Sequence, residues 1–370
     1  MKRVVITGYY GVGNLGDDLA LYYLVKNIFK ILPKVKINVF FIKNGSVDCY
    51  KTLFNNDKKV RFYERSSVKN LYKIIKNCDV LIFGGGTCFH EGGAGALYEF
   101  LIAKLLKIKT LYLGVGIGKL LSFKSKLKCI FSMYLADLVA FRDLNSLNTA
   151  LSLAPSRKEK LYLTADFVYL GIEDYLKLRS SQEKKINGTL LISWRDFGFW
   201  EVPSGYEQVL LKSLYKNILN ICKSYEIKKI SCLPLCDLDI NINKKIISDL
   251  RKILPSHVEI NFIFKNCIFE KLSEIAKVNF FISARLHGLF LGRILNIPTI
   301  GFNYSPKIRY FADEIGENCV VSLEELLNDS RIIKFKLSSL KSKEIDKVFL
   351  IQKKKEAYNN IKYIEKILLN

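Results

Sequence analysis

The chain has 370 residues, of which 49% are hydrophobic and 25% are charged, so it is too apolar for a disordered protein and long enough for two domains. Its net charge of +23 predicts attraction to acidic ligands such as phosphorylated substrates or anionic lipid, although a compositional excess of lysine would also explain it. The lysines are spread along the whole chain without a recognisable nucleic-acid-binding module, so nucleic acid is not an expected partner.

The beginning of the chain and its cysteines predict a cytoplasmic protein. Residues 1–8 form a β-branched strand that runs into a glycine loop, which is not the pattern of a signal peptide. The nine cysteines are scattered without a CxxC pair, which favours reduced thiols packed as small hydrophobic groups. The longest apolar stretch, residues 129–141, contains Asp137 and is too short to cross a bilayer.

The first half of the chain alternates predicted strands and helices. Its strands are continuously apolar, as in a parallel sheet that helices cover on both faces. This pattern predicts an N-terminal Rossmann-like domain over residues 1–170. The predicted strands are residues 3–8, 36–43, 79–83 and 110–115, and the predicted helices are residues 17–32, 68–77 and 95–106.

The second half repeats this alternation and predicts a C-terminal Rossmann-like domain over residues 188–337. The charged, weakly patterned residues 171–187 mark the junction. Two doubly wound domains of this kind bind ligands in a cleft at the carboxyl ends of their strands. Strands are predicted at residues 188–194, 229–235, 258–264, 279–283 and 298–302, and helices at residues 206–224 and 289–296.

The last segment, residues 338–370, is rich in lysine and has apolar residues at helical spacing. It is expected to be either a basic helix that crosses back to the N-terminal domain or a solvated basic tail.

A glycine-rich loop, GYYGVGNLGDD, follows the first predicted strand and opens a helix. Such a loop brings backbone N–H groups close to a ligand, which makes Asn14 and Asp17 candidate substrate-binding residues. Asp17 is equally suited to cap the helix. Residues 11–16 match GxGxxG, but no acid follows the second strand to bind a ribose; this disfavours NAD, while Lys43 leaves NADP open.

A second glycine run, residues 84–86, follows a buried strand. Gly85 and Gly86 let the backbone approach a ligand closely, or form a tight turn. His90 and Glu91 follow in the same loop, but one histidine and one acid without a second ligand pair are a weak metal signal, so no metal is expected.

A cationic residue follows each of two predicted strands in the second domain. Arg195 follows the strand at residues 188–194, and its planar fork suits a carboxylate or a phosphate; a surface salt bridge to Asp196 is the alternative. Lys307 stands in the segment NYSPK after the last strand and is suited to contact phosphate as a point charge, or to be solvated.

The segment SARLHG, residues 283–288, is the most informative. Residues two apart in an extended turn point the same way, so Arg285 and His287 are expected to face the ligand together. An arginine can hold an anionic donor while an imidazole transfers protons. A histidine satisfied within the structure is the alternative interpretation of His287.

These motifs, in this order, resemble the polysaccharide pyruvyl transferase family over about residues 1–320. The loop with Asn14 and Asp17 and the glycine strand end are similar to the N-terminal signature of the family. The triplets FRD at 141–143 and TAD at 164–166 are similar to its mid-chain markers. Arg285-Leu286-His287, followed by Pro298 and by Tyr304-Ser305-Pro306-Lys307, is similar to its C-terminal signature. This chain has Asp18 where the family usually has Glu, Ser305 where it usually has Asp, and an uncommon form of the loop at 89–91.

The resemblance implies a fold like that of the two-domain GT-B glycosyltransferases and a bacterial type of surface polysaccharide or exopolysaccharide biosynthesis. It implies phosphoenolpyruvate as the donor substrate, no other cofactor and no metal, and a pyruvate ketal formed across two hydroxyls of a saccharide or its lipid-linked precursor. By matching position, Arg195 and Arg285 would hold the donor, His287 would be the acid and base, and Lys307 and Tyr304 would line the substrate site.

Two other functions stay open. A glycosyltransferase with a nucleotide-sugar donor would share the fold and would need an acid for the ribose, for which Glu270, Glu274 and Asp313 are candidates. A non-catalytic polysaccharide- or phosphate-binding protein is less compatible with the pair Arg285 and His287. Whatever the acceptor, the loop at residues 196–206 is expected to shape its pocket.

A basic amphipathic stretch at residues 119–131 allows peripheral contact with the inner face of the cell membrane. Its lysines interleave with large apolar residues, a pattern that suits an anionic bilayer. The pattern is interpreted first as an ordinary helix packed on the sheet. The lysines are Lys119, Lys124, Lys126 and Lys128, and the apolar residues are Leu120, Leu121, Phe123, Leu127, Ile130 and Phe131.

Overall fold

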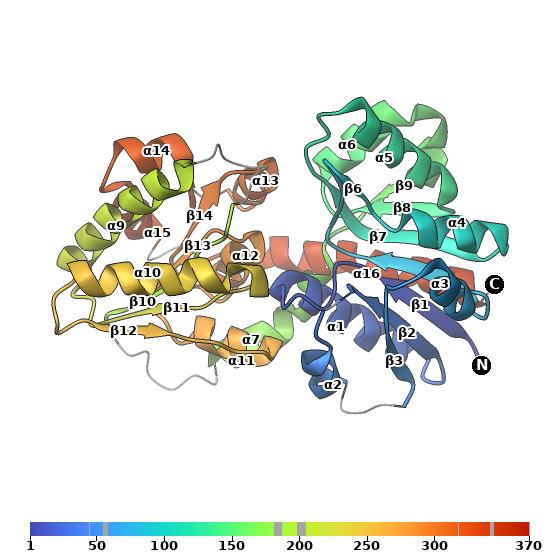
Figure 1. Cartoon of the computed structure of the whole chain (residues 1–370), viewed down its shortest axis with the longest axis horizontal. Coiled ribbons are helices and arrows are strands. Elements are labelled where there is room, and N and C mark those ends of the chain that lie inside the picture. Colours follow the sequence, from blue (N-terminus) through green and yellow to red (C-terminus); the bar gives the residue numbers. More distant parts are fainter. Residues whose placement is uncertain are drawn as a thin grey trace. The chain divides into compact units, whose positions relative to one another are not determined.

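The computed structural model describes residues 1–43, 45–54, 58–180, 187–197, 205–316, 318–340 and 344–369. The chain folds into two compact units (Figure 1). Unit 1 comprises Met1–Ile172 and Leu350–Asn370, and unit 2 comprises Glu173–Phe349. None of the described helices is both long and apolar enough to span a membrane.

Unit 1 is built on a sheet with the strand order β3-β2-β1-β4-β7, which β8 and β9 continue beyond β7. The strands of this row are parallel, and the hairpin β5-β6 pairs with the end of β7. Strand β1 lies in the middle, with β2 and β3 on one side and β4 and β7 on the other, so the order reverses between β1 and β4. The strands are β1 (Arg3–Thr7), β2 (Lys36–Phe41), β3 (Val60–Glu64), β4 (Val80–Gly84), β5 (Thr87–His90), β6 (Gly93–Ala94), β7 (Lys109–Ile117), β8 (Leu138–Phe141) and β9 (Leu161–Leu163).

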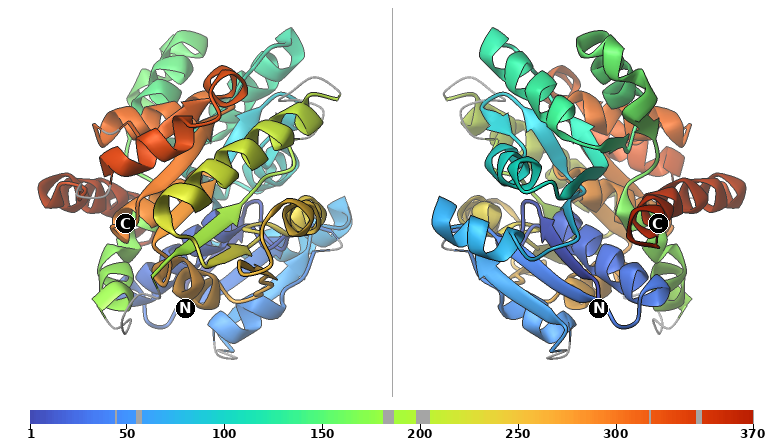
Figure 2. Two further views of the ribbon diagram at one scale, coloured as in Figure 1. Left: turned by 90° about the vertical axis from the view of Figure 1, so that its left-hand side faces the viewer. Right: turned by 90° about the vertical axis from the view of Figure 1, so that its right-hand side faces the viewer.

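Helices cover both faces of this sheet, and two apolar clusters fill the space between the sheet and the helices (Figures 1 and 2). Strand β4 is buried along its whole length and β7 is buried at all but its two end residues, which explains why their interiors are mostly apolar in the sequence. The helical segments are α1 (Leu15–Ile31), α2 (Asp48–Leu53), α3 (Val68–Ile75), α4 (Leu97–Leu105), α5 (Phe123–Leu135), α6 (Leu144–Leu153), α16 (Lys347–Leu369) and the 3-10 turns η1 (Pro155–Lys160) and η2 (Phe167–Gly171).

The C-terminal helix α16 packs on unit 1. Ile361, Ile364 and Leu368 are buried in the cluster that also holds the first strand. The buried Asn360 side chain accepts a hydrogen bond from Thr164 Oγ1 (3.0 Å) and donates one to the carbonyl of Ala165 (3.0 Å). Within the predicted segment 338–370, residues 347–369 thus form a helix whose apolar face is buried in unit 1.

Unit 2 is a parallel sheet in the order β12-β11-β10-β13-β14-β15, again with helices on both faces. Its strands are β10 (Thr189–Ser193), β11 (Lys229–Cys232), β12 (Glu259–Phe262), β13 (Phe280–Ser283), β14 (Thr299–Asn303) and β15 (Val320–Ser322). Its helical segments are α7 (Ile172–Ser180), α9 (Tyr206–Tyr225), η3 (Asp237–Asp239), α10 (Ile240–Ile253), α11 (Ile268–Ala276), α12 (Leu286–Ile294), α13 (Pro306–Glu314), α14 (Leu323–Asn328) and α15 (Ile332–Leu340).

The unit bounds differ from the predicted domains 1–170, 188–337 and 338–370 at the junctions. Helix α7 belongs to unit 2, where Arg179 Nη1 donates to the carbonyl of Ala276 (2.7 Å). The end of α15 also stays in unit 2, and the returning segment begins near residue 350. Both unit bounds fall inside a helix, the first within α7 and the second within α16.

Candidate functional site

The carboxyl ends of β10 and β13 adjoin at the point where the strand order of unit 2 reverses. Ser193 pairs with Ser283, and Ser283 pairs with Gly301 of β14. Arg195 and Arg285 each stand two residues beyond these strand ends, so both candidate cations lie at the topological switch point. Open parallel sheets bind their ligands at this point.

Arg195, Tyr304 and Lys307 form a cluster at this edge. Arg195 Nη1 donates to Tyr304 Oη (2.9 Å), and the guanidinium carbon lies 4.8 Å from the centre of the Tyr304 ring. Lys307 Nζ lies 6.0 Å from the same ring centre. Arg195 Nε also donates to the backbone carbonyl of Asp196 (3.4 Å). Two cations thus contact the ring of Tyr304, and cation–π interactions of this kind become stronger when water is excluded.

Arg285 is held by Asp239, a residue that sequence reasoning missed. Arg285 Nε and Nη2 donate to the two carboxylate oxygens of Asp239, both at 2.7 Å, and the carboxylate is fully buried. Burial alone would lower the pKa of the Arg285 guanidinium, but its hydrogen bonds and charge interaction with Asp239 raise the pKa above its ordinary value. Arg285 is therefore a fixed cation of fixed orientation. The sequence signal that could have identified Asp239 is an acidic residue in the turn after a buried strand.

Asn243 of α10 holds the backbone around this pair. Its Oδ1 accepts from the Trp194 N–H (3.0 Å), and its Nδ2 donates to the carbonyls of Trp194 (2.7 Å) and Asp239 (2.8 Å). The Trp194 ring packs edge-on against Phe302 and Phe197. Asn243 and the aromatic rings thereby fix the two segments that carry Arg195 and Asp239.

His287 lies in the first turn of α12, for which Arg285 is the N-cap. The prediction that Arg285 and His287 share an extended turn is wrong, because only Arg285 has extended backbone angles and the helix begins at Leu286. The two residues still lie at the same strand end. The N–H groups of the first turn add partial positive charge to this edge.

Gly288 lets α12 begin close to β13. A Cβ atom at this position would lie 2.1 Å from Ser283 Oγ and 2.8 Å from a methyl carbon of Leu235. Because these neighbours belong to the core, Gly288→Ala is expected to destabilise the protein by about 1–3 kcal/mol in urea unfolding. In a Ser283→Ala background, which lacks the nearest atom, the cost should be smaller; equal costs in both backgrounds would contradict this explanation.

In unit 1, the predicted glycine loops also meet at a switch point, between β1 and β4. Gly85 and Gly86 have φ angles of 81° and 79°, which side chains rarely adopt, and a Cβ at Gly86 would lie 2.9 Å from Asp17 Oδ1. Asn14 Nδ2 donates to Asp17 Oδ2 (2.6 Å). The four candidate residues of these loops are thus brought together, although the N-cap of α1 is Asn14 and not Asp17.

The two mid-chain markers meet beside this glycine edge. Arg142 Nη1 donates to Asp166 Oδ2 (2.7 Å), and its Nη2 donates to Thr87 Oγ1 (3.0 Å). Burial lowers the pKa of Arg142, but Asp166 and Asp143 raise it above its ordinary value. Arg142 therefore ties the strand after Gly86 to the segment that follows β9.

The start of α1 is acidic, which bears on the dinucleotide alternative. Asp17 and Asp18 are buried in its first turn, and Tyr50 Oη donates to Asp18 while accepting from the Gly11 N–H (2.7 Å). A pyrophosphate would have to approach two buried carboxylates at this helix start. Hydroxyl groups of a saccharide suit these acceptors better than phosphate does.

Glu91 has a structural role rather than a metal-binding one. Its carboxylate accepts from the Leu121 and Ser122 N–H groups (2.8 and 3.0 Å) and from the hydroxyls of Ser122 and Ser125 (2.6 and 3.0 Å), at the start of α5. His90 Nδ1 lies 2.9 Å from the Glu91 carbonyl. The described residues contain no group of three or more His, Cys, Asp or Glu that could hold a metal.

The hydrogen bonds to Glu91 predict a pH dependence. Those from Ser122 chiefly lower the pKa of Glu91 to about 2, below that of about 4.3 for an unfolded chain. Its contribution to stability is therefore complete above about pH 4.3 and is lost as the pH falls towards 2. Unfolding free energies of wild type and Glu91→Gln should converge over this range; a difference that does not vary with pH would contradict the prediction.

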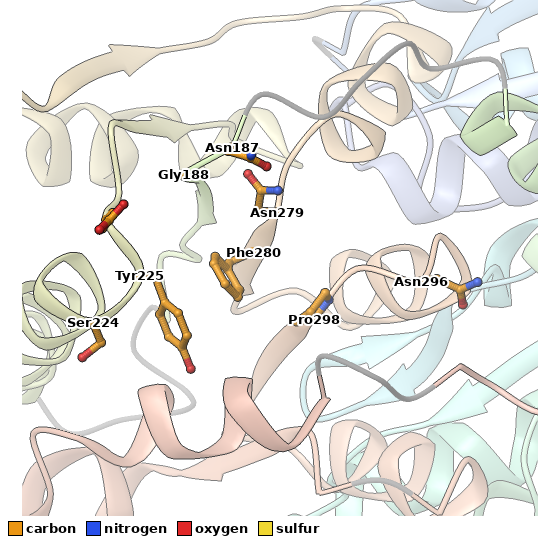
Figure 3. Close-up of a pocket in the computed structure, with 9 residues that line it drawn as sticks. Asn187, Gly188, Ser224, Tyr225, Asn279, Phe280, Asn296 and Pro298 are labelled. Carbon is orange, nitrogen blue, oxygen red and sulfur yellow. The ribbon is translucent and has the colours of Figure 1, made fainter.

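A cavity of about 470 Å³ lies at the opposite edge of the unit 2 sheet (Figure 3). Gly188, Asn279 and Pro298 line it just before β10, β13 and β14 begin, and Tyr225 lies at the end of α9. None of the candidate site residues lines this cavity.

The acids considered for a ribose lie on helices. Glu274 pairs with Lys277 (3.2 Å) and Asp313 pairs with Arg309 (3.0 Å), each within its own helix. Glu270 is in the first turn of α11. The predicted acceptor loop, residues 196–206, lies mostly outside the described residues because 198–204 are not among them.

Solved structures that share this fold include UDP-GlcNAc 2-epimerases and MurG. The UDP-GlcNAc 2-epimerase of Methanocaldococcus jannaschii is 15% identical with a TM-score of 0.70, and the comparison covers 98% of this chain and 99% of the epimerase. The Neisseria meningitidis UDP-GlcNAc 2-epimerase is 12% identical with a TM-score of 0.62, and MurG of Acinetobacter baumannii is 12% identical with a TM-score of 0.55; both comparisons cover 100% of each chain. These matches confirm the GT-B-like fold of two Rossmann-like units.

No curated protein sequence matches this chain significantly. A family model described as polysaccharide pyruvyl transferase matches residues 14–306, which include Asn14, the second glycine run, Arg195, Arg285 and His287. Because this match covers most of the chain and both units, the chain belongs to the polysaccharide pyruvyl transferase family.

Proposed function

We propose that the protein transfers the pyruvyl group of phosphoenolpyruvate to two hydroxyls of a saccharide and forms a pyruvate ketal. The observation that carries this proposal is the group of cations at the switch point of unit 2. Arg195 and Lys307 flank Tyr304, and Arg285 follows the adjacent strand. Phosphoenolpyruvate carries a carboxylate and a phosphate on adjacent groups, so it requires several cations within one small site.

Asp239 prepares Arg285 for this task. Because Nε and Nη2 of Arg285 bind Asp239, its Nη1 is left for the ligand, and the guanidinium plane is fixed before the ligand arrives. Arg195 and Lys307 would take the remaining anionic oxygens, and the first turn of α12 would add N–H donors. The cations would also stabilise the phosphate as it leaves.

His287 would transfer the protons. Its imidazolium protonates the methylene carbon of phosphoenolpyruvate, and a saccharide hydroxyl adds to the neighbouring carbon and returns its proton to His287. The bond between that carbon and the phosphate oxygen then breaks, and a second hydroxyl closes the ketal ring as its proton leaves with the phosphate. The products are one ketal and one inorganic phosphate for each donor consumed.

Unit 1 would bind the saccharide. Asn14 and Asp17 present amide and carboxylate groups beside the open backbone of Gly85 and Gly86, and such groups suit sugar hydroxyls. The buried acids of α1 disfavour a phosphorylated ligand at this position. We place the reaction in the cytoplasm, with a polysaccharide or its lipid-linked precursor as the acceptor.

Thermal unfolding with excess ligand tests the donor. Phosphoenolpyruvate at about 100 times its dissociation constant should stabilise the protein by about 2.7 kcal/mol, and Arg285→Ala should abolish the shift. Arg331→Ala, an exposed arginine of unit 2, is the matched control and should keep it. A shift with UDP- or GDP-sugars and none with phosphoenolpyruvate would support the glycosyltransferase alternative, and a shift with NADPH alone would support the dinucleotide alternative.

A further inference from the structure

Helix α5 of unit 1 exposes a row of large apolar side chains. Phe123, Leu127, Phe131 and Tyr134 are 74%, 47%, 49% and 46% exposed, and Leu121, just before the helix, is 74% exposed. Successive members of the row on the helix are four, four and three residues apart, so they lie along one face. We call these four helical residues the α5 stripe.

The exposure of the α5 stripe does not arise from a wrongly oriented helix, because the opposite face of α5 is the one that packs in the core. The other face of α5 buries Ser125, Cys129, Ser132 and Met133, and both Cys129 and Met133 belong to the core cluster of unit 1. The four hydrogen bonds to Glu91 fix the start of the helix. The sequence-based interpretation of a helix packed on the domain is therefore correct for one face and leaves the other unexplained.

Lysines border the stripe. At 3.6 residues per turn, Lys124 and Lys128 lie on one side of the α5 stripe and Lys126 lies on the other. Lys124 and Lys126 are exposed, and Lys128 is partly exposed. Residues 119–135 contain four lysines and no Asp or Glu, so the face as a whole is cationic.

We propose that α5 docks on an anionic lipid bilayer, with the α5 stripe at the boundary between headgroups and acyl chains and the lysines against the lipid phosphates. Aromatic and aliphatic side chains bordered by lysines have the composition of helices that lie in the membrane interface. The positive face complements an anionic surface and would repel a second copy of itself. The proposal does not depend on the donor or on the chemistry of unit 2.

Vesicle sedimentation tests this docking with two triple variants. The full-length protein should bind vesicles of phosphatidylcholine mixed with phosphatidylglycerol and should not bind phosphatidylcholine alone. Lys124→Gln/Lys126→Gln/Lys128→Gln should lower the affinity about 100-fold, and Phe123→Ser/Leu127→Ser/Phe131→Ser should lower it by at least about 10-fold.

Two matched triples control for total charge and total exposed apolar surface. Three exposed lysines of α9 are replaced by Gln in the first, and three exposed apolar residues of α15 and α16 are replaced by Ser in the second. Both controls should bind vesicles nearly as well as wild type. The control positions are Lys212, Lys216 and Lys223, and Phe335, Val348 and Ile351.

Three results would overturn the proposal. They are binding that is insensitive to anionic lipid, an equal loss in the α9 triple, and wild-type binding by the stripe triple together with a changed oligomeric state. The third result would instead make the stripe a contact between copies. Since a triple variant can misfold, Phe131→Trp provides a separate measurement: its added fluorescence should shift to the blue with anionic vesicles, and an unchanged spectrum would also overturn the proposal.

Discussion

Replacing His287 by alanine is expected to slow phosphate release by about 10²- to 10⁴-fold and to leave phosphoenolpyruvate binding in place. The imidazole is the proposed proton donor to the methylene carbon, and that proton is needed only as the reaction proceeds. In the proposed function, Arg195, Arg285 and Lys307 bind the donor, and all three side chains remain in this variant. Single-turnover phosphate release and the donor-induced thermal shift measure the two effects separately.

His257 supplies the matched control, since it is exposed and lies in the turn after α10. His257→Ala should release phosphate at the wild-type rate. If His287→Ala instead released phosphate normally, the proton-transfer role would be wrong. If it lost donor binding together with turnover, His287 would be a donor contact.

Replacing Asp239 by alanine is expected to destabilise the protein by about 3–5 kcal/mol and to remove donor binding. The substitution leaves Arg285 as a largely buried cation without its bidentate partner, and the cost of that unpaired charge dominates. It also frees the guanidinium to rotate, so the orientation that Arg285 presents to a ligand is lost. Urea unfolding and the phosphoenolpyruvate-induced thermal shift report the two effects.

Asp237→Ala is the control for this change, because Asp237 is an exposed acid two residues away. It should alter the unfolding free energy by less than about 0.5 kcal/mol. Asp239→Asn keeps the volume of the side chain and removes its charge. Full stability and full donor binding in Asp239→Ala would contradict the role given to the pair.

Local patterns predicted the parts of the fold that depend on local physics. The interiors of β4 and β7 are buried on both faces and are therefore mostly apolar, which is visible directly in the sequence. The glycines after β4 predicted a backbone conformation that other residues rarely adopt, and Gly85 and Gly86 indeed have positive φ angles. Arg195 and Arg285 were placed correctly because each follows a strand end, and parallel strands present their carboxyl ends on one edge.

Features that depend on distant contacts were not predictable from such patterns. Asp239 is separated from Arg285 by 46 residues and reads as an ordinary turn acid. Strands β8 and β9 are short. Strand β8 lies in the same apolar run as the end of α5, so no local pattern marks where α5 ends and β8 begins. The start of α12 at Leu286 was missed because SARLHG lacks a capping side chain, and this error produced the wrong geometry for His287.

The return of α16 to unit 1 has a consequence for the order in which the chain folds during synthesis. Asn360, Ile361 and Ile364 complete the interior of the first unit, yet they leave the ribosome after the whole of the second unit. Until α16 is synthesised, the unit 1 side chains that pack against these residues lack that cover, whereas all residues of unit 2 are already present. The final packing of unit 1 therefore follows the synthesis of unit 2, and removal of α16 is expected to expose apolar side chains of unit 1 and to favour aggregation.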